Sequence, residues 1–155
     1  MRQTAVLLAL VLWVAGCTSY HFVEVIDKHE TTIAAGGEAF VINPALGQEL
    51  DILRRARLYE LTDDSSATIK IELKPLEVAG ACGNPLLGTT LTLGLFPGAV
   101  YDQYRFSYSE RTVSGVSERN VLIVVQMRVW AFEFLFSGNK KDEIARGLRV
   151  AFNRQ

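Results

Sequence analysis

The spacing of apolar residues predicts two amphipathic helices. Asn43 can cap a helix and Pro44 suits its first turn, and Leu46, Leu50 and Leu53 then recur on one helical face. This pattern predicts a helix over residues 44–61. Near the carboxyl end, Asn139 can cap a second helix with acidic residues in its first turn. Its expected apolar face consists of Ile144, Ala145, Leu148, Ala151 and Phe152, and its expected polar face of Asp142, Arg146, Arg149 and Asn153.

Other stretches alternate in the manner of strands. Residues 68–73 alternate Thr, Ile, Lys, Ile, Glu and Leu, which predicts a half-buried strand. Tyr104, Phe106 and Tyr108 would share one face of another strand, opposite Gln103, Arg105 and Ser107. Residues 111–119 are polar and predict a turn, and residues 120–136 predict a second strand that pairs back as an antiparallel hairpin. The far end of that second strand carries the rings of Trp130, Phe132, Phe134 and Phe136, a pattern more typical of a core than of a ligand cage.

A short strand is expected at residues 20–26, followed by a polar loop over residues 27–38. If this strand belongs to the domain, only Thr18 and Ser19 separate it from Cys17, whereas disorder over residues 18–38 would give a much longer tether. Together the elements predict an α+β fold, an antiparallel sheet with two amphipathic helices packed on one face.

One stretch lacks any charged side chain. It runs from Val78 to Tyr101 and holds five glycines and two prolines, so a membrane-crossing helix is disfavoured. Two interpretations stay open: a strand at residues 89–95 buried on both faces, which we favour, or a loop that dips among lipid headgroups. The apolar residues concerned are Leu86, Leu87, Leu91, Leu93, Leu95 and Phe96.

The amino terminus has the layout of an export signal. Arg2 precedes the uninterrupted apolar run of residues 5–15, which small Gly16 separates from Cys17. That run is much shorter than the roughly twenty residues a membrane-spanning helix needs. We therefore expect residues 1–16 to be a signal peptide, residues 17–38 to hold the modified cysteine and a short tether or first strand, and residues 39–155 to form one domain.

Residues 14–17 read VAGC, which resembles the lipobox of bacterial lipoproteins. The resemblance implies cleavage between Gly16 and Cys17 and a diacylglycerol with further acylation (palmitate) on Cys17. Thr18 stands where an aspartate would favour the inner membrane, so for a Gram-negative source the resemblance implies the periplasmic face of the outer membrane. TLTLGLFPG, with the aromatic strand after it, also resembles segments of uncharacterised proteobacterial lipoproteins, which implies no activity.

The charge balance of the chain argues against one class of partner, nucleic acids. The chain has 16 basic and 17 acidic residues, and loss of the signal removes only Arg2, which leaves 15 against 17 and a net charge of −2. Such a balance lacks the positive field that nucleic acid requires, so we expect no nucleic-acid partner.

Candidate chemistry is sparse. The histidines are His21 and His29, both near the amino terminus, and no metal-binding, nucleophile-elbow or phosphate-loop motif occurs, so we expect no metal and no cofactor. Two acidic pairs, Asp63 with Asp64 and Asp142 with Glu143, sit at a turn and a helix start, where acids serve local structure. Cys82 is expected to be a buried inert thiol, with an intermolecular disulfide or a reactive thiol as the alternative.

These observations favour a non-enzymatic, lipid-anchored envelope protein that binds another envelope protein or an assembly component. One alternative is a periplasmic carrier or sensor of an apolar small ligand, with a pocket lined by residues 130–136 and 86–96. A second is a hydrolase that uses His21 or His29.

Overall fold

A computed structural model describes residues 18–26, 36–82, 91, 98–129 and 138–153. The described residues form seven strands and two helices. In chain order these are β1 (Thr18–Val25), β2 (Glu38–Val41), α2 (Gly47–Ala56), β3 (Glu60–Thr62), β4 (Ile69–Leu73), β5 (Glu77–Cys82), β6 (Gly98–Thr112), β7 (Gly115–Val129) and α4 (Lys140–Asn153).

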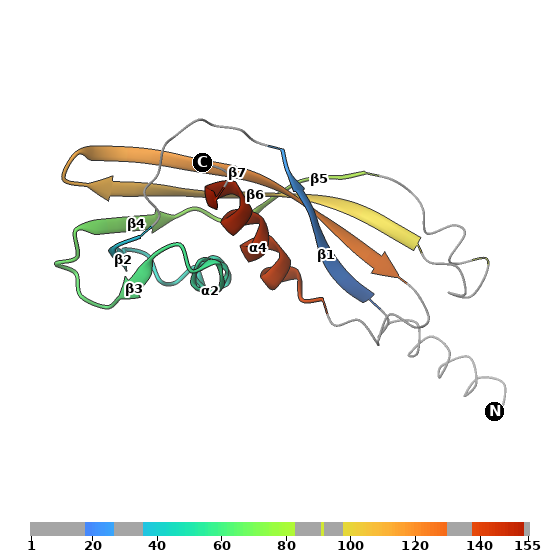
Figure 1. Cartoon of the computed structure of the whole chain (residues 1–155), viewed down its shortest axis with the longest axis horizontal. Coiled ribbons are helices and arrows are strands. Elements are labelled where there is room, and N and C mark those ends of the chain that lie inside the picture. The colour runs from blue at the N-terminus through green and yellow to red at the C-terminus, as the bar shows by residue number, and fades with distance from the viewer. Residues whose placement is uncertain (1–17, 27–35, 83–90, 92–97, 130–137, 154–155) are drawn as a thin grey trace, which may run out of the picture.

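The strands form one sheet in the order β1-β7-β6-β4-β2-β3, and β5 also pairs with β6 (Figure 1). Of the expected antiparallel sheet with two helices packed on one face, the coarser part is confirmed: the fold combines α and β structure, with a mostly antiparallel sheet and two helices among the described residues. The sheet is not antiparallel throughout, because β2 pairs in parallel with both β3 and β4. Parallel neighbours need a crossover connection, and α2 supplies it between β2 and β3.

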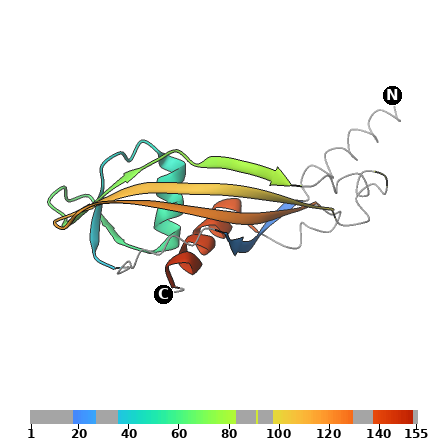
Figure 2. The ribbon, with the colours of Figure 1, turned by 90° about the horizontal axis from the view of Figure 1, so that it is seen from above.

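The hairpin of β6 and β7 is the longest feature of the molecule (Figures 1 and 2). Each strand has 15 residues, which at 3.3 Å per residue extend about 50 Å. The antiparallel hairpin is confirmed, but the expected polar turn over residues 111–119 is wrong: only Val113 and Ser114 lie between the paired residues Thr112 and Gly115. Gly115 has a φ of 136°, which glycine adopts without steric cost.

The core lies between this hairpin and the helices. Tyr104, Phe106 and Tyr108 are 3%, 0% and 0% exposed, so the expected shared face is confirmed. The register places Phe106 opposite Val121 and Tyr104 opposite Ile123, so β7 contributes its buried residues to the same face. Figure 1 shows α2 and α4 on that side of the sheet.

The carboxyl-terminal helix follows its sequence pattern closely. The Oδ1 atom of Asn139 accepts a hydrogen bond from the backbone N–H of Lys141 at 3.0 Å, the expected cap. Its expected apolar face is buried or half-buried, and Asp142, Arg146 and Arg149 are exposed. At Gly147 a Cβ would lie 2.5 Å from the Cγ2 of Ile123, so glycine there permits close approach of helix to sheet.

The first helix departs from its pattern. It spans Gly47–Ala56, not residues 44–61. The side chain of Asn43 does not cap it but hydrogen-bonds both the N–H and the carbonyl of Leu73, which fixes the end of β4. The helix ends because Arg57 adopts a left-handed conformation with φ 53°, and the chain then turns into β3.

The opposite face of the sheet is polar and carries cross-strand ion pairs. Arg111 contacts Glu72 at 2.6 Å and Arg105 contacts Glu77 at 3.3 Å. A third pair joins Lys74 to Glu118 at 3.0 Å. The pair of Arg111 and Glu72 joins the neighbouring strands β6 and β4 within the polar stretch 111–119, and opposite charges on neighbouring strands stabilise their pairing.

Candidate functional site

Several element ends meet at one end of the sheet, which we call the Thr18 end. Thr18 of β1 pairs with Val129, the last residue of β7, and Val129 pairs with Gly98, the first residue of β6. Cys82, the last residue of β5, pairs with Tyr101 nearby. Cys82, Gly98 and Val129 therefore all lie at this end of the sheet.

The strand β1 is built into the domain. It pairs with β7 from Thr18 onward, with a register shift between Phe22 and Glu24. At this irregularity the backbone N–H of Phe22 donates to the carboxylate of Glu143 on α4 at 2.7 Å. Gly138 lies so close to the backbone of Tyr20 that a Cβ there would clash with it. The expected strand at residues 20–26 is therefore confirmed, with slightly different bounds. It begins two residues earlier, at Thr18, and ends at Val25.

Most of the candidate residues lie outside the described part of the chain. This applies to Gly16 and Cys17, to His29, to the rings at residues 130–136, and to Leu86, Leu87, Leu93, Leu95 and Phe96. Leu91 is described, and its side chain is 78% exposed. The pocket expected for an apolar ligand falls on these same stretches.

Two further candidates are placed by the structure. The Nε2 of His21 and the Oγ of Ser19 form a hydrogen bond of 2.8 Å within β1. The backbone of Cys82 closes β5 against Tyr101. Within residues 18–26, 36–82, 91, 98–129 and 138–153, no group of three or more histidine, cysteine or acidic side chains could hold a metal ion.

The acidic pairs hold structure, as expected, but in different ways. Asp64 accepts a hydrogen bond from the backbone N–H of Ser66 at 2.8 Å, which closes the turn and lowers the pKa of Asp64. Asp142, in contrast, reaches across to the other helix and contacts Arg55 at 2.6 Å. The role of Asp142 is thus tertiary, where only a local role was expected.

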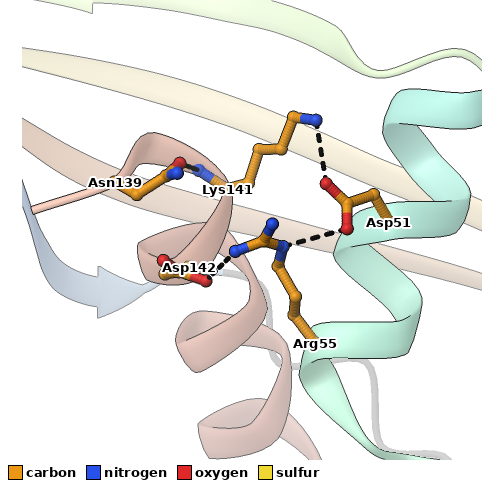
Figure 3. Close-up of polar contacts among 5 residues, drawn as sticks. All are labelled: Asp51, Arg55, Asn139, Lys141 and Asp142. Carbon is orange, nitrogen blue, oxygen red and sulfur yellow. Dashed lines mark hydrogen bonds and ion pairs between the residues drawn. The ribbon is translucent and has the colours of Figure 1, made fainter.

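That contact belongs to an exposed network between α2 and α4 (Figure 3). Arg55 also contacts Asp51 at 3.0 Å, and Lys141 contacts Asp51 at 2.8 Å. The hydrogen bond from Lys141, followed by that from Arg55, lowers the pKa of Asp51. The hydrogen bonds that Arg55 donates to Asp142 and to Asp51 raise the pKa of Arg55. The network ties the two helices together at their surface.

A second polar cluster is buried and was not expected from the sequence. Arg119 and Glu110 form an ion pair at 3.4 Å with side chains 9% exposed each. The hydroxyl of Tyr59 donates to Glu110 at 3.3 Å and lies 3.1 Å from that of Tyr108. Burial raises the pKa of Tyr59 to about 12 and raises that of Tyr108 further. Glu110 lies two residues beyond Tyr108 and so continues the inward row of Tyr104, Phe106 and Tyr108, a signal that went unused because a turn was expected from residue 111.

Arg119 is incompletely satisfied. Its Nε and Nη2 donate to Glu110 at 3.4 Å, while its buried Nη1 has no hydrogen-bond partner among the residues that the structure describes. A buried donor without a hydrogen-bond partner destabilises the folded state. The attraction between Arg119 and Glu110 therefore has to offset much of this cost.

No known family model matches the chain, and no curated protein sequence does. Among solved structures, it is similar to the PelC dodecamer from Paraburkholderia phytofirmans, with 10% identity and a TM-score of 0.35 over 89% of this chain and 99% of that one. A variant of the same PelC matches with 11% identity and a TM-score of 0.35, over 86% of this chain and 97% of the other. Similarity at this level transfers no function.

No helix within the described ranges is both long and apolar enough to cross a membrane.

Proposed function

We propose that this chain is a lipid-anchored envelope protein, held through acylated Cys17 at the periplasmic face of the outer membrane, whose domain binds another envelope protein or an assembly component without catalysis. The observation that carries the proposal is the start of β1 at Thr18, the residue directly after the lipobox cysteine.

The anchor and the sheet would be joined without a linker. One residue spans about 3.5 Å at most, and Thr18 is already paired with Val129. Acyl chains on Cys17 would therefore hold the Thr18 end of the domain against the bilayer. A domain held this closely has a restricted orientation, which suits presentation of a fixed surface to a partner.

The residues that flank segment 83–97 of the uncharged stretch fit the same arrangement. Cys82 ends β5 and Gly98 begins β6, and both lie at the Thr18 end. Leu91, which lies between them in the sequence, is 78% exposed, so burial on both faces of a strand is excluded for this residue.

The acidic candidates are engaged in the fold. Asp142 bonds Arg55, Glu143 bonds the backbone of β1, and Asp64 closes a turn. These contacts stabilise the domain.

Metabolic labelling with a fatty-acid analogue tests the anchor. The wild-type chain should incorporate the label and sediment with membranes, because cleavage exposes Cys17 for acylation. The Cys17→Ala variant should lose both properties, and the matched control Cys82→Ala should keep both. Label absent from the wild-type chain, or retained by Cys17→Ala, would contradict the anchor.

Photo-crosslinking in cells tests the binding role. A photoreactive residue at Val113, which is 93% exposed at the hairpin tip, points away from the Thr18 end. The proposal predicts a discrete crosslinked protein from an exposed position such as this or Val116, which is 67% exposed. Discrete crosslinks from neither position would count against a protein partner.

A further inference from the structure

Charge is divided unevenly between the two layers of the domain. We define the helix layer as α2 with Arg57 and α4. It holds seven basic residues and four acidic ones, a net charge of +3. The other described residues hold six basic and ten acidic ones, a net charge of −4. The basic residues of the helix layer are Arg54, Arg55, Arg57, Lys140, Lys141, Arg146 and Arg149.

Several arginines of this layer are free of acidic neighbours. Arg54, Arg57 and Arg149 are exposed and form no ion pair with any residue in the described ranges. Arg146 reaches Glu143 only at 3.8 Å. On the opposite face of the sheet, in contrast, Arg105 and Arg111 each bond a glutamate. The excess positive charge therefore lies on the outward side of the helices.

One end of the helix layer lies beside the Thr18 end. The carboxylate of Glu143 accepts a hydrogen bond from the backbone N–H of Phe22, and Gly138 lies against the backbone of Tyr20. Figure 1 shows the first turn of α4 near the start of β1, with α2 farther along the sheet. An anchor on Cys17 would bring the start of α4 close to the membrane, and the rest of the helix layer would reach the same surface with the domain lying on its helix side.

We propose that the outward face of the helix layer, through Arg54, Arg57, Arg146 and Arg149, binds anionic phospholipid headgroups. A guanidinium group suits a phosphate because its parallel N–H groups form two hydrogen bonds to it. This inference rests on the proposed anchor for the orientation of the domain. It adds which surface faces the membrane and the lipid class that it binds.

The contact is electrostatic. No large apolar side chain of α2 or α4 is strongly exposed among the described residues, so these helices offer nothing to insert among acyl chains. Each basic residue near an anionic surface increases the binding constant roughly fivefold. The attraction weakens beyond a Debye length of about 8 Å at physiological salt. Binding should therefore need anionic lipid and should be reversed by salt.

The experiment uses the unacylated chain from Thr18, which retains every described element. Co-sedimentation is measured with vesicles of phosphatidylethanolamine alone and with vesicles that also contain phosphatidylglycerol. We expect binding only to the second kind, reversed at high salt. The double variant Arg54→Glu with Arg149→Glu removes two of the four arginines and should weaken binding by roughly twenty- to thirtyfold.

The matched control makes an equal change in net charge, but on the sheet. Lys70→Glu with Arg128→Glu alters two exposed basic residues outside the helix layer and should leave binding close to wild type. Absent binding, equal binding to both vesicles, or equal loss in both double variants would overturn the proposal. Salt-sensitive self-association, or capture of an acidic protein lost with Arg54 and Arg149 but without vesicle binding, would also overturn it.

Since the assay omits the acyl chains, its failure leaves the Cys17 result unaffected. Conversely, failure of acylation would not prevent vesicle binding by these arginines. The two proposals can therefore fail separately.

Discussion

Two polar clusters in this domain use similar side chains in opposite surroundings. Arg119 and Glu110 are 9% exposed and lie beneath Tyr59. Arg55 and Asp142 are 38% and 50% exposed and join α2 to α4 at the surface. The surface pair is the shorter, at 2.6 Å against 3.4 Å, yet water and salt screen it. Burial, not distance, should therefore decide which pair the fold depends on.

The largest expected effect comes from breaking the buried pair. Glu110→Gln removes the carboxylate and leaves Arg119 as a buried, uncompensated charge. We expect the free energy of unfolding to fall by about 3 to 5 kcal/mol. Urea unfolding followed by circular dichroism measures it. A loss no larger than that of a surface variant would show that Arg119 reaches water.

Removing both charges should recover most of this loss. Glu110→Leu combined with Arg119→Met replaces the pair by apolar side chains, and such replacements are often neutral or stabilising. The double variant should then unfold at a higher urea concentration than Glu110→Gln. If the double variant is less stable than Glu110→Gln, the ion pair stabilises the fold beyond the neutralisation of its own two buried charges.

A smaller effect is expected from Tyr59→Phe, which deletes the hydroxyl bonded to Glu110 and Tyr108. The expected loss is about 1 kcal/mol near neutral pH. Because burial raises the pKa of Tyr59 from 10.0 to about 12, its contribution to stability is fully present below pH 10. It declines as the pH rises from about 10 through about 12.

The variant should therefore lose less stability across this alkaline range than the wild type does. Unfolding measured at successive pH values tests this. Identical pH dependence in both proteins would mean that Tyr59 ionises freely in the folded state.

The smallest effect is expected at the surface. Arg55→Ala breaks the contacts with Asp51 and Asp142, but solvent screens these exposed pairs, so the loss of stability should be small. The difference from wild type should shrink as salt is added. Arg54→Ala, on the same helix but without an ion pair among the described residues, is the matched control. A large, salt-insensitive loss for Arg55→Ala would contradict the comparison.

The two asparagines at the expected helix starts illustrate the limits of local patterns. Asn139 caps α4 as expected, because the residues it needs are its immediate neighbours. Asn43 has the same local setting but binds the backbone of Leu73, 30 residues away. A local sequence pattern does not show whether an asparagine side chain will bind the free amides of the helix start or the backbone of a distant strand that offers two hydrogen bonds. For that reason the first helix begins later than expected, at Gly47.

The features of the candidate site also differ in whether a local sequence pattern predicts them. The lipobox is a contiguous motif, so Cys17 could be proposed from four residues, and its acylation stays a prediction. The short β2 and β3 escaped detection because they carry too few alternating positions. β5 escaped because its residues EVAGAC show no clear alternation and its register shifts. The row of Tyr104, Phe106 and Tyr108 extends to Glu110, but its contact with Arg119 depends on how β6 and β7 pair, which the expected turn at residues 111–119 did not allow.

The sequence by itself determined the mixed α and β composition, the face of α4 that is buried and the inward row of Tyr104, Phe106 and Tyr108. These follow from helical and strand periodicity, which acts over a few neighbouring residues. Only the tertiary structure decided the parallel pairing of β2, the convergence at Thr18 and the excess charge on the helix layer. Those depend on contacts between residues far apart in the chain, whose free energies appear only once the layers are packed.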